Sequence, residues 1–111
     1  MESLREKQAK FLVCVSKLVA FAYSQNIKIC VLEWYRTKER QEQLVKEGKS
    51  WTMNSKHISG LAVDLGILKD GNISWDYKDY EQLGEYWEKH LGQTWGGNWK
   101  QKDCVHFEYK N

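Results

Sequence analysis

The sequence predicts one small α+β domain, residues 1–111, in which a central antiparallel sheet is flanked by helices. Three observations favour this class. Two segments carry apolar residues at helical spacing, β-branched and aromatic segments alternate with them, and an Asp-Gly pair marks a tight hairpin turn. A chain of 111 residues can bury one hydrophobic core but not two. We therefore expect any site to lie at the edge of that core and of its sheet.

The N-terminal half is predicted to form a long helix, a strand and a short helix. The helix covers about residues 4–25 and the strand, IKICVLEWY, covers 27–35. Thr37 is a candidate N-cap of the short helix, which Gly48 ends, and a loop then leads to Ser55. The apolar positions of the long helix are Phe11, Val15, Leu18, Val19 and Ala22.

The C-terminal half is predicted to add two strands and a helix. The segment LAVDLGI, 61–67, is a strand, and the turn KDGN leads from it into ISW. A helix over 76–92 begins after Asp76 and ends at Gly92. A loop, TWGGNWKQKD, precedes the last strand, CVHFEY, at 104–109. The inner face of the helix carries Tyr80, Leu83 and Trp87.

The large aromatic residues fall into two groups. Those on predicted strands or on the helix are expected in the core, and they are Trp34, Trp75, Trp87 and Tyr109. Those in predicted loops could stack on a sugar or peptide face or could cover the core, and they are Trp51, Trp95 and Trp99.

Composition excludes several classes of protein. Apolar runs such as 11–15 are far shorter than the roughly 20 residues that span a bilayer. The N-terminus MESLREKQAK lacks the features of a secretory signal, so we expect a protein that stays in the cytoplasm unless something else releases it. A net charge of +2 without a Lys/Arg cluster argues against a nucleic-acid partner. Three cysteines without CxxC spacing argue against a disulfide framework, and Cys14 and Cys30 are expected to be buried thiols.

Two histidines and one aspartate stand out as candidate metal ligands. His57 precedes the strand that holds Asp64, and His106 lies in the last strand. Asp64 emerges between Ala62 and Gly66 on one face of its strand, which leaves room for a ligand. Zinc suits two imidazoles and one carboxylate, and a catalytic zinc keeps a position open for water, whose pKa it lowers to about 7.

Two further residues could assist this chemistry. Asp103 stands three residues before His106, so it can act as a base beside the metal only if it lies in the loop before the strand. Arg36 directly follows the strand VLEWY, where its guanidinium could hold a carbonyl or carboxylate oxygen.

Other interpretations of these and of two further residues stay open. Cys104 could replace the carboxylate of Asp64 as a thiolate ligand. His90 could simply complement the dipole at the end of its helix. The other interpretations are a hydrogen-bonded histidine for His57 or His106, a partner of a backbone amide for Asp64, a solvated charge for Arg36 and a turn residue for Asp103.

The sequence resembles a known family of zinc peptidases, the VanY-like family, in five segments. In order these are YRTKERQ, GKSW, SKHISGLAVDLG, DGNISWD and WGGNWKQKDCVHFEY. The family includes the D-alanyl-D-alanine carboxypeptidases and the L-alanyl-D-glutamate endopeptidases of bacteriophage endolysins. The resemblance covers about residues 30–110 and is specific, because all five segments keep their order and spacing.

The resemblance implies a role for each matching residue. One Zn²⁺ ion would be held by His57, Asp64 and His106. Asp103 would be the catalytic acid and base, where many carboxypeptidase members have Glu, and this shorter acid resembles the phage branch. The remaining implied residues are Arg36, which polarises the substrate carbonyl, and Ser55 and Gln41, which bind substrate or support the site.

The implied function is hydrolysis of the L-Ala–D-Glu bond in the peptidoglycan stem peptide by a phage endolysin or prophage lysis enzyme. We expect a monomer with no nucleic-acid or membrane partner, whose single domain recognises the wall through its catalytic groove. Two alternatives stay open: a D,D-carboxypeptidase that removes terminal D-Ala, and a noncatalytic zinc-dependent wall-binding module.

Overall fold

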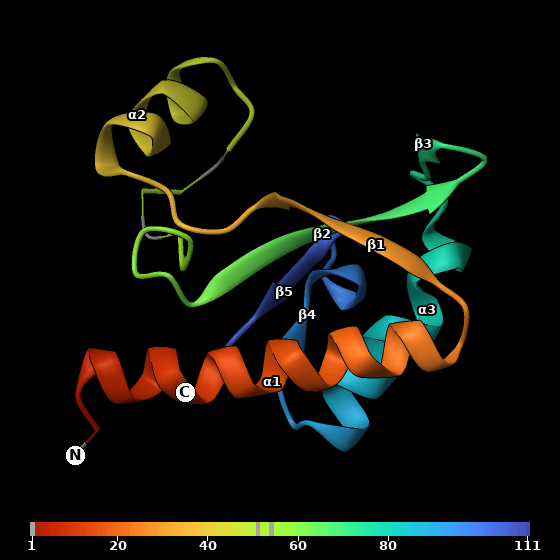
Figure 1. Cartoon of the computed structure of the whole chain (residues 1–111). Helices are drawn as coiled ribbons and strands as arrows, with labels where there is room; N and C mark the ends of the chain where they lie inside the picture. The colour runs from red at the N-terminus through yellow and green to blue at the C-terminus, as the bar shows by residue number, and fades with distance from the viewer. Residues whose placement is uncertain (1, 51, 54) are drawn as a thin grey trace.

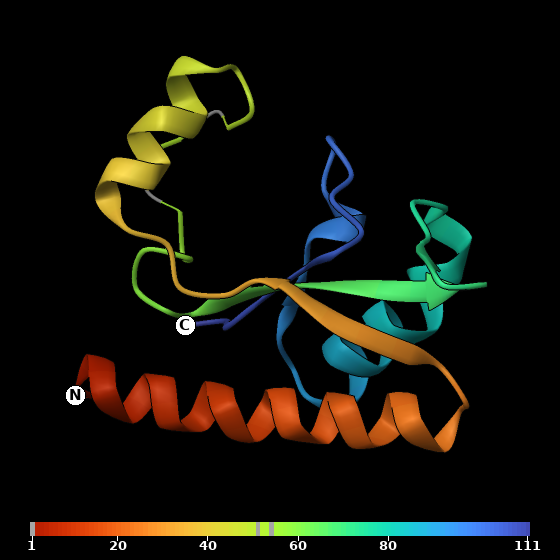
Figure 2. The same cartoon turned by 45° about the horizontal axis from the view of Figure 1, so that its top comes forward.

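The computed structural model describes residues 2–50, 52–53 and 55–111 and shows a sheet with helices α1 and α3 on one face and α2 beyond the other (Figures 1 and 2). This arrangement confirms the predicted α+β class. The helices are α1 (Leu4–Ser24), α2 (Lys38–Lys46) and α3 (Tyr77–Glu85), with a π-helical turn (Tyr86–His90) and a 3₁₀ turn (Gly96–Asn98). The strands are β1 (Lys28–Glu33), β2 (Ala62–Lys69), β3 (Asn72–Ile73), β4 (Thr94–Trp95) and β5 (His106–Glu108).

The sheet is antiparallel, with the order β1-β2-β5-β4 and with β3 paired to β2. The β2–β5 ladder ends at the pair Asp64–His106. On the other side of β2, Val31 pairs with Leu65 but Glu33 pairs with Asp64, so Leu32 is the extra residue of a β-bulge. Because opposed residues point to the same face, the bulge places Glu33 beside Asp64.

Local sequence signals set the predicted element boundaries. Ser3 forms a capping box with Glu6 at the start of α1, and the Thr37 hydroxyl accepts from the Arg40 amide at the start of α2. The Asp-Gly turn between β2 and β3 has both residues in the left-handed region, as a type I′ hairpin requires.

Several boundaries differ from the prediction, three of them for a clear structural reason. Strand β1 ends at Glu33 because the next residues leave the ladder, and the Arg36 amide donates to the His57 carbonyl. The α-helix predicted over 76–92 becomes a π-helical turn after Glu85, with the Leu91 amide donating to the Tyr86 carbonyl. The last strand starts at His106, because residues 104–105 form a turn.

The core lies between the sheet and the helices of one face. Phe11 of α1 packs edge-on against Trp87, which in turn packs edge-on against Phe107 of β5. The predicted inner face of the helix over 76–92 is confirmed, since Tyr80 and Leu83 of α3 and Trp87 of the π-helical turn are fully buried. Among the described residues, no helix has the length and apolar character needed to cross a bilayer.

Several packing predictions were wrong. Trp75 is 68% exposed, because it lies in the polar turn between β3 and α3 and not on a strand. Cys14 and Cys30 are free thiols but only half-buried. Trp34 is also half-buried, but it packs against the core as predicted, with Phe11 edge-on to its ring. Val19 lies on the outer side of α1. Trp95, expected in a loop, is buried in β4.

Trp95 ties α3 to the loop before β5. Its ring contacts Gly84 so closely that a Cβ there would lie 2.1 Å from the indole, and Gly97 approaches it with a corresponding distance of 2.2 Å. Its Nε1 donates to the carbonyl of Cys104 at 2.8 Å. The two glycines are therefore required for this close packing.

We predict that Gly84→Ala destabilises the fold by about 1–3 kcal/mol, because the added methyl overpacks the Trp95 ring. Helix propensity alone would give the opposite sign, a gain of up to about 1 kcal/mol. Urea unfolding measures the free energy. Glu81→Ala, an exposed change on the same helix, serves as the control, and a Gly84→Ala protein as stable as the wild type would contradict the packing argument.

Candidate metal centre

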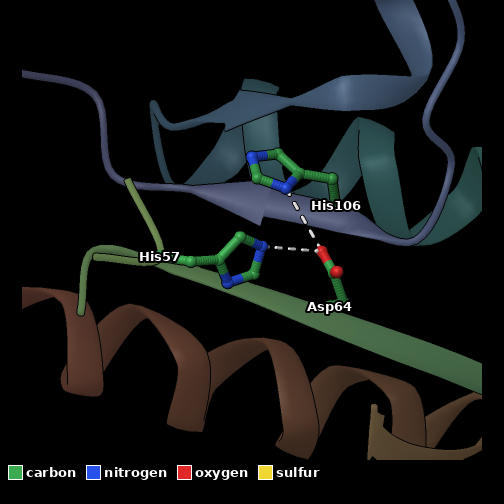
Figure 3. A group of neighbouring side chains, drawn as sticks. All are labelled: His57, Asp64 and His106. Carbon is green, nitrogen blue, oxygen red and sulfur yellow. Dashed lines mark hydrogen bonds and ion pairs between the residues drawn. The ribbon is translucent and has the colours of Figure 1, made fainter. Parts of the chain in front are cut away.

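His57, Asp64 and His106 converge on one point above β2 and β5 (Figure 3). The Asp64 Oδ1 atom lies 3.2 Å from His57 Nε2 and 3.2 Å from His106 Nδ1. The two imidazoles are 2% and 6% exposed. The prediction that the three residues come together is confirmed, and among the described residues they are the one group of this kind.

The fold brings the three residues together in two ways. Asp64 and His106 are opposed across the β2–β5 ladder, so their side chains leave the same face of the sheet. His57 lies in the turns before β2, where its amide donates to the Ser55 hydroxyl at 3.2 Å and its carbonyl accepts from the Arg36 amide at 2.9 Å.

In each imidazole, the nitrogen that faces away from Asp64 lies within hydrogen-bonding distance of an oxygen acceptor. His57 Nδ1 lies 2.7 Å from the Trp34 carbonyl oxygen, and His106 Nε2 lies 2.8 Å from Glu108 Oε1. A carbonyl and an ionised carboxylate only accept, so these two nitrogens carry hydrogens. The other two nitrogens face Asp64 and could present lone pairs to a metal ion that displaces their own hydrogens.

This donor set fits zinc. Tetrahedral zinc with bonds of about 2.0–2.1 Å places its ligand atoms about 3.3 Å apart, close to the separations seen here. The three donor atoms lie within 4.8 Å of one another. Two nitrogens and one oxygen also match the ligands of catalytic zinc sites, in which a further position is open.

The electrostatics of the group favour a cation. Burial acts to raise the pKa of Asp64, but hydrogen bonds from His106 and His57 outweigh it and the pKa falls to about 2. Burial acts to lower the pKa of His106, but Asp64 and Glu108 outweigh it and the pKa rises to about 9. The half-buried Asp64 carboxylate is thus ionised at neutral pH, and a positive charge beside it is favourable.

Asp103 lies in the loop before β5, as its predicted role requires. Its amide donates to the Gly96 carbonyl at 2.9 Å, and its carbonyl accepts from the His106 amide at 3.2 Å. A Cβ on Gly96 would lie 2.6 Å from the Asp103 carbonyl oxygen, so only glycine permits this approach. Burial raises the pKa of the Asp103 carboxyl, which makes it a better proton acceptor than an exposed aspartate.

Arg36 is held rigidly in the wall of the same cleft. Its Nε donates to Glu33 Oε1 at 3.0 Å, its Nη2 forms an ion pair with the same carboxylate, and its Nη1 donates to Gln41 Oε1 at 2.8 Å. The side chain is 10% exposed. Arg36 is thus a preorganised cation and not a solvated charge.

The two predicted substrate-binding residues have different positions. Ser55 lines the cleft, with its hydroxyl 3.5 Å from Arg36 Nη1. Gln41 is fully buried and donates to the Ser50 hydroxyl and to the Thr52 carbonyl. Since its carboxamide is also bonded to Arg36, Gln41 is placed to support the site, one of the two roles predicted for it.

The cleft has a volume of about 790 Å³, which is large enough for a peptide segment. The Trp99 ring stands 4.9 Å from the ring of His106 and is 38% exposed, so its face is available to a ligand. Trp51 lies outside the described residues. Other lining residues include Glu33, Leu44, Lys49, Lys56, Lys100 and Glu108.

Two alternative ligands are not part of the group. Burial raises the pKa of the Cys104 thiol, which disfavours the thiolate, and the Cys104 carbonyl is bound by Trp95. His90 stacks on Tyr86 in the π-helical turn. Sequence reasoning missed Glu33, Lys56 and Glu108, although Glu108 follows His106 at the spacing that shares a face of a strand.

A family model described as D-alanyl-D-alanine carboxypeptidase, an M15 peptidase model, matches residues 48–109. The chain belongs to this peptidase family. It is 32% identical over 99 residues to the L-alanyl-D-glutamate peptidase of Listeria phage A118, an alignment that covers 85% of this chain and 35% of that protein. It is 36% identical over 110 residues to the peptidoglycan L-alanyl-D-glutamate endopeptidase CwlK of Bacillus subtilis, with 82% and 66% covered. The chain thus spans about a third of the phage relative and just under two thirds of CwlK.

Two solved structures share the fold. The L-Ala D-Glu endopeptidase ChiX of Serratia marcescens has a TM-score of 0.66 and 33% identity, with 76% of this chain and 68% of that chain covered. The D,D-pentapeptidase VanY of a VanB-type resistance cassette, an E175A mutant in complex with Zn(II), has a TM-score of 0.65 and 21% identity, with 89% and 70% covered. The second likeness concerns the fold alone.

We predict that the protein binds one Zn²⁺ per chain and that His57→Ala abolishes binding, because two donors cannot close the site. Isothermal titration calorimetry measures the stoichiometry. His90→Ala removes an imidazole outside the group and should bind zinc as the wild type does. Full stoichiometry in the His57→Ala protein would contradict the ligand assignment.

Proposed function

We propose that the protein is a zinc-dependent peptidase that hydrolyses the L-Ala–D-Glu bond in the stem peptide of peptidoglycan. The observation that carries the proposal is the convergence of His57, Asp64 and His106 in one cleft with Asp103 and Arg36. The activities for which the phage A118 peptidase, CwlK and ChiX are named support the choice of bond.

We assign the zinc ligands to His57 Nε2, Asp64 and His106 Nδ1, the atoms that converge in the cleft. Zinc at this point would activate water and polarise the scissile carbonyl. The outer hydrogen bonds to Trp34 and Glu108 orient the imidazoles for this role.

We assign Asp103 the role of general base and acid. Its raised pKa suits it to take a proton from the attacking water and to deliver that proton to the amine that leaves. The contact between its backbone and the His106 amide keeps the acid close to the ligand group.

We assign Arg36 the stabilisation of negative charge on the carbonyl oxygen of the substrate. Glu33 and Gln41 fix the guanidinium before substrate arrives, so little reorganisation is needed during the reaction. Trp99 and the Ser55 hydroxyl would contact the bound peptide from the walls of the cleft.

The relative from Listeria phage A118 supports a role in lysis by a phage or prophage. In that setting the protein would be held in the cytoplasm, reach the wall after the membrane is opened, and act there as a monomer. CwlK is named for the same bond specificity but comes from a bacterium, so a role in bacterial wall turnover is the alternative setting.

We predict that Asp103→Asn lowers kcat by about 10²–10⁴-fold, because the amide cannot transfer the proton. Zinc affinity and the urea midpoint should stay at wild-type values. Asp70→Asn makes the same change in the exposed β2–β3 turn and should keep full activity. Wild-type turnover by the Asp103→Asn protein would remove this residue from the mechanism.

The bond specificity is tested by mass spectrometry of fragments released from purified peptidoglycan, with a chelator and again with zinc restored. We expect chelator-sensitive release of peptides that begin at D-Glu, with L-Ala left on the muramic acid. Loss of terminal D-Ala alone would instead establish a D,D-carboxypeptidase. Binding to the wall fragments with no change of mass would indicate a noncatalytic binding module.

A further inference from the structure

We propose that Glu108 is a positioning residue that fixes the tautomer and orientation of His106, and that Lys56 anchors Glu108 for this purpose. The inference rests on the proposed zinc site, and it adds two residues to which neither the sequence motifs nor the relatives assign a role. It concerns residues that do not themselves hold the metal.

Glu108 is placed against His106 by strand geometry. The two residues are two apart in β5, so their side chains leave the same face. The backbone of Glu108 is fixed between Ala62 of β2 and Thr94 of β4, and its carbonyl accepts from Trp87 Nε1 at 3.3 Å. The carboxylate is therefore presented from the rigid interior of the sheet.

Lys56 holds the second oxygen of the same carboxylate. Its Nζ lies 3.3 Å from Glu108 Oε2 and also donates to the carbonyl of Tyr109. The side chains of Lys56 and Glu108 are 27% and 15% exposed, so this pair is more sheltered than a surface ion pair. With one oxygen on Lys56, Glu108 Oε1 is directed to His106 Nε2.

The contact decides which nitrogen of His106 can bind a metal. A carboxylate at Nε2 requires a hydrogen there, which leaves Nδ1 as the ligand atom in the neutral ring. Without Glu108 either nitrogen could carry the hydrogen, and the ring could rotate away from Asp64. The backbone carbonyl of Trp34 sets the tautomer of His57 in the same way, but a side-chain substitution cannot remove it. The contact between Glu108 and His106 involves a side chain, so it can be removed by mutation.

Lys56 also links two of the ligands. It directly precedes His57 in the chain, and through Glu108 it is joined to His106 on β5. The ion pair therefore ties the turns that hold one ligand to the strand that holds another. Loss of Lys56 should loosen the spacing of the two imidazoles without removing a donor.

The test is the zinc dissociation constant, measured by chelator competition, for Glu108→Ala, Glu108→Gln and Lys56→Met. We expect affinity to fall about 10–100-fold in Glu108→Ala and less in Glu108→Gln, whose carboxamide oxygen can still accept from Nε2. Lys56→Met should weaken binding by a smaller factor than Glu108→Ala. The control is Glu85→Gln, because Glu85 pairs with Lys89 at 3.4 Å on an exposed surface and touches no histidine.

Nitrogen-15 NMR of the imidazoles in the zinc-loaded proteins separates positioning from a general loss of structure. In the wild type and the Glu85→Gln protein, His106 should carry its hydrogen on Nε2. In the Glu108→Ala protein, that signal should shift or divide between two forms, while the His57 signal is retained. Glu108→Gln and Lys56→Met provide the same readouts if Glu108→Ala does not fold.

Unchanged zinc affinity in Glu108→Ala, Glu108→Gln and Lys56→Met would overturn the inference, as would a fall in affinity with an unchanged His106 signal. Either result leaves the proposed function intact, provided that the wild type binds zinc. A wild-type protein that binds no zinc would overturn the proposed function itself.

Discussion

The pairing of Asp64 with His106 across β2 and β5 is the contact on which the candidate site depends. It is at once a step in the backbone ladder and a contact between a buried carboxylate and an imidazole. A slip of the register by one residue would send Asp64 into the core and Val63 into the cleft. The hydrophobic packing of Val63 and Leu65 against the helices therefore also sets the direction of Asp64.

The loop that carries Asp103 depends on close packing behind the site. The ring of Trp95 packs closely against Gly84 and Gly97, and its Nε1 donates to the carbonyl of Cys104. Gly96, next to it, binds the amide of Asp103. Since the Trp95 ring also packs on α3, the position of Asp103 depends on the hydrophobic core as well as on the polar residues around it.

Much of this organisation could be predicted from the sequence, and the exceptions have physical causes. Helix caps and the Asp-Gly turn are local signals, so Thr37, Asp76 and the β2–β3 hairpin were predicted correctly. The grouping of His57, Asp64 and His106 was predicted because their residue types and spacing are specific. Trp75 was misplaced because burial depends on tertiary contacts, which its sequence neighbours do not reveal.

The partners of the site residues were missed for a related reason. Glu108 lies at strand spacing from His106, but a glutamate in a strand is equally typical of a solvated face. The role of Glu33 depends on the bulge at Leu32, and nothing in the sequence IKICVLEWY marks where an extra residue enters the ladder. Lys56 meets its partner only because β2 and β5 are neighbours.

The bulge also affects the outer edge of the sheet. β1 is an edge strand, and its exposed Val31 and Leu32 would favour intermolecular strand pairing and aggregation. An extra residue at Leu32 interrupts the regular spacing of the free amides and carbonyls, so a second chain cannot extend the ladder along the whole strand. The bulge at Leu32 therefore places Glu33 beside Asp64 and also opposes strand pairing between copies of the chain along β1.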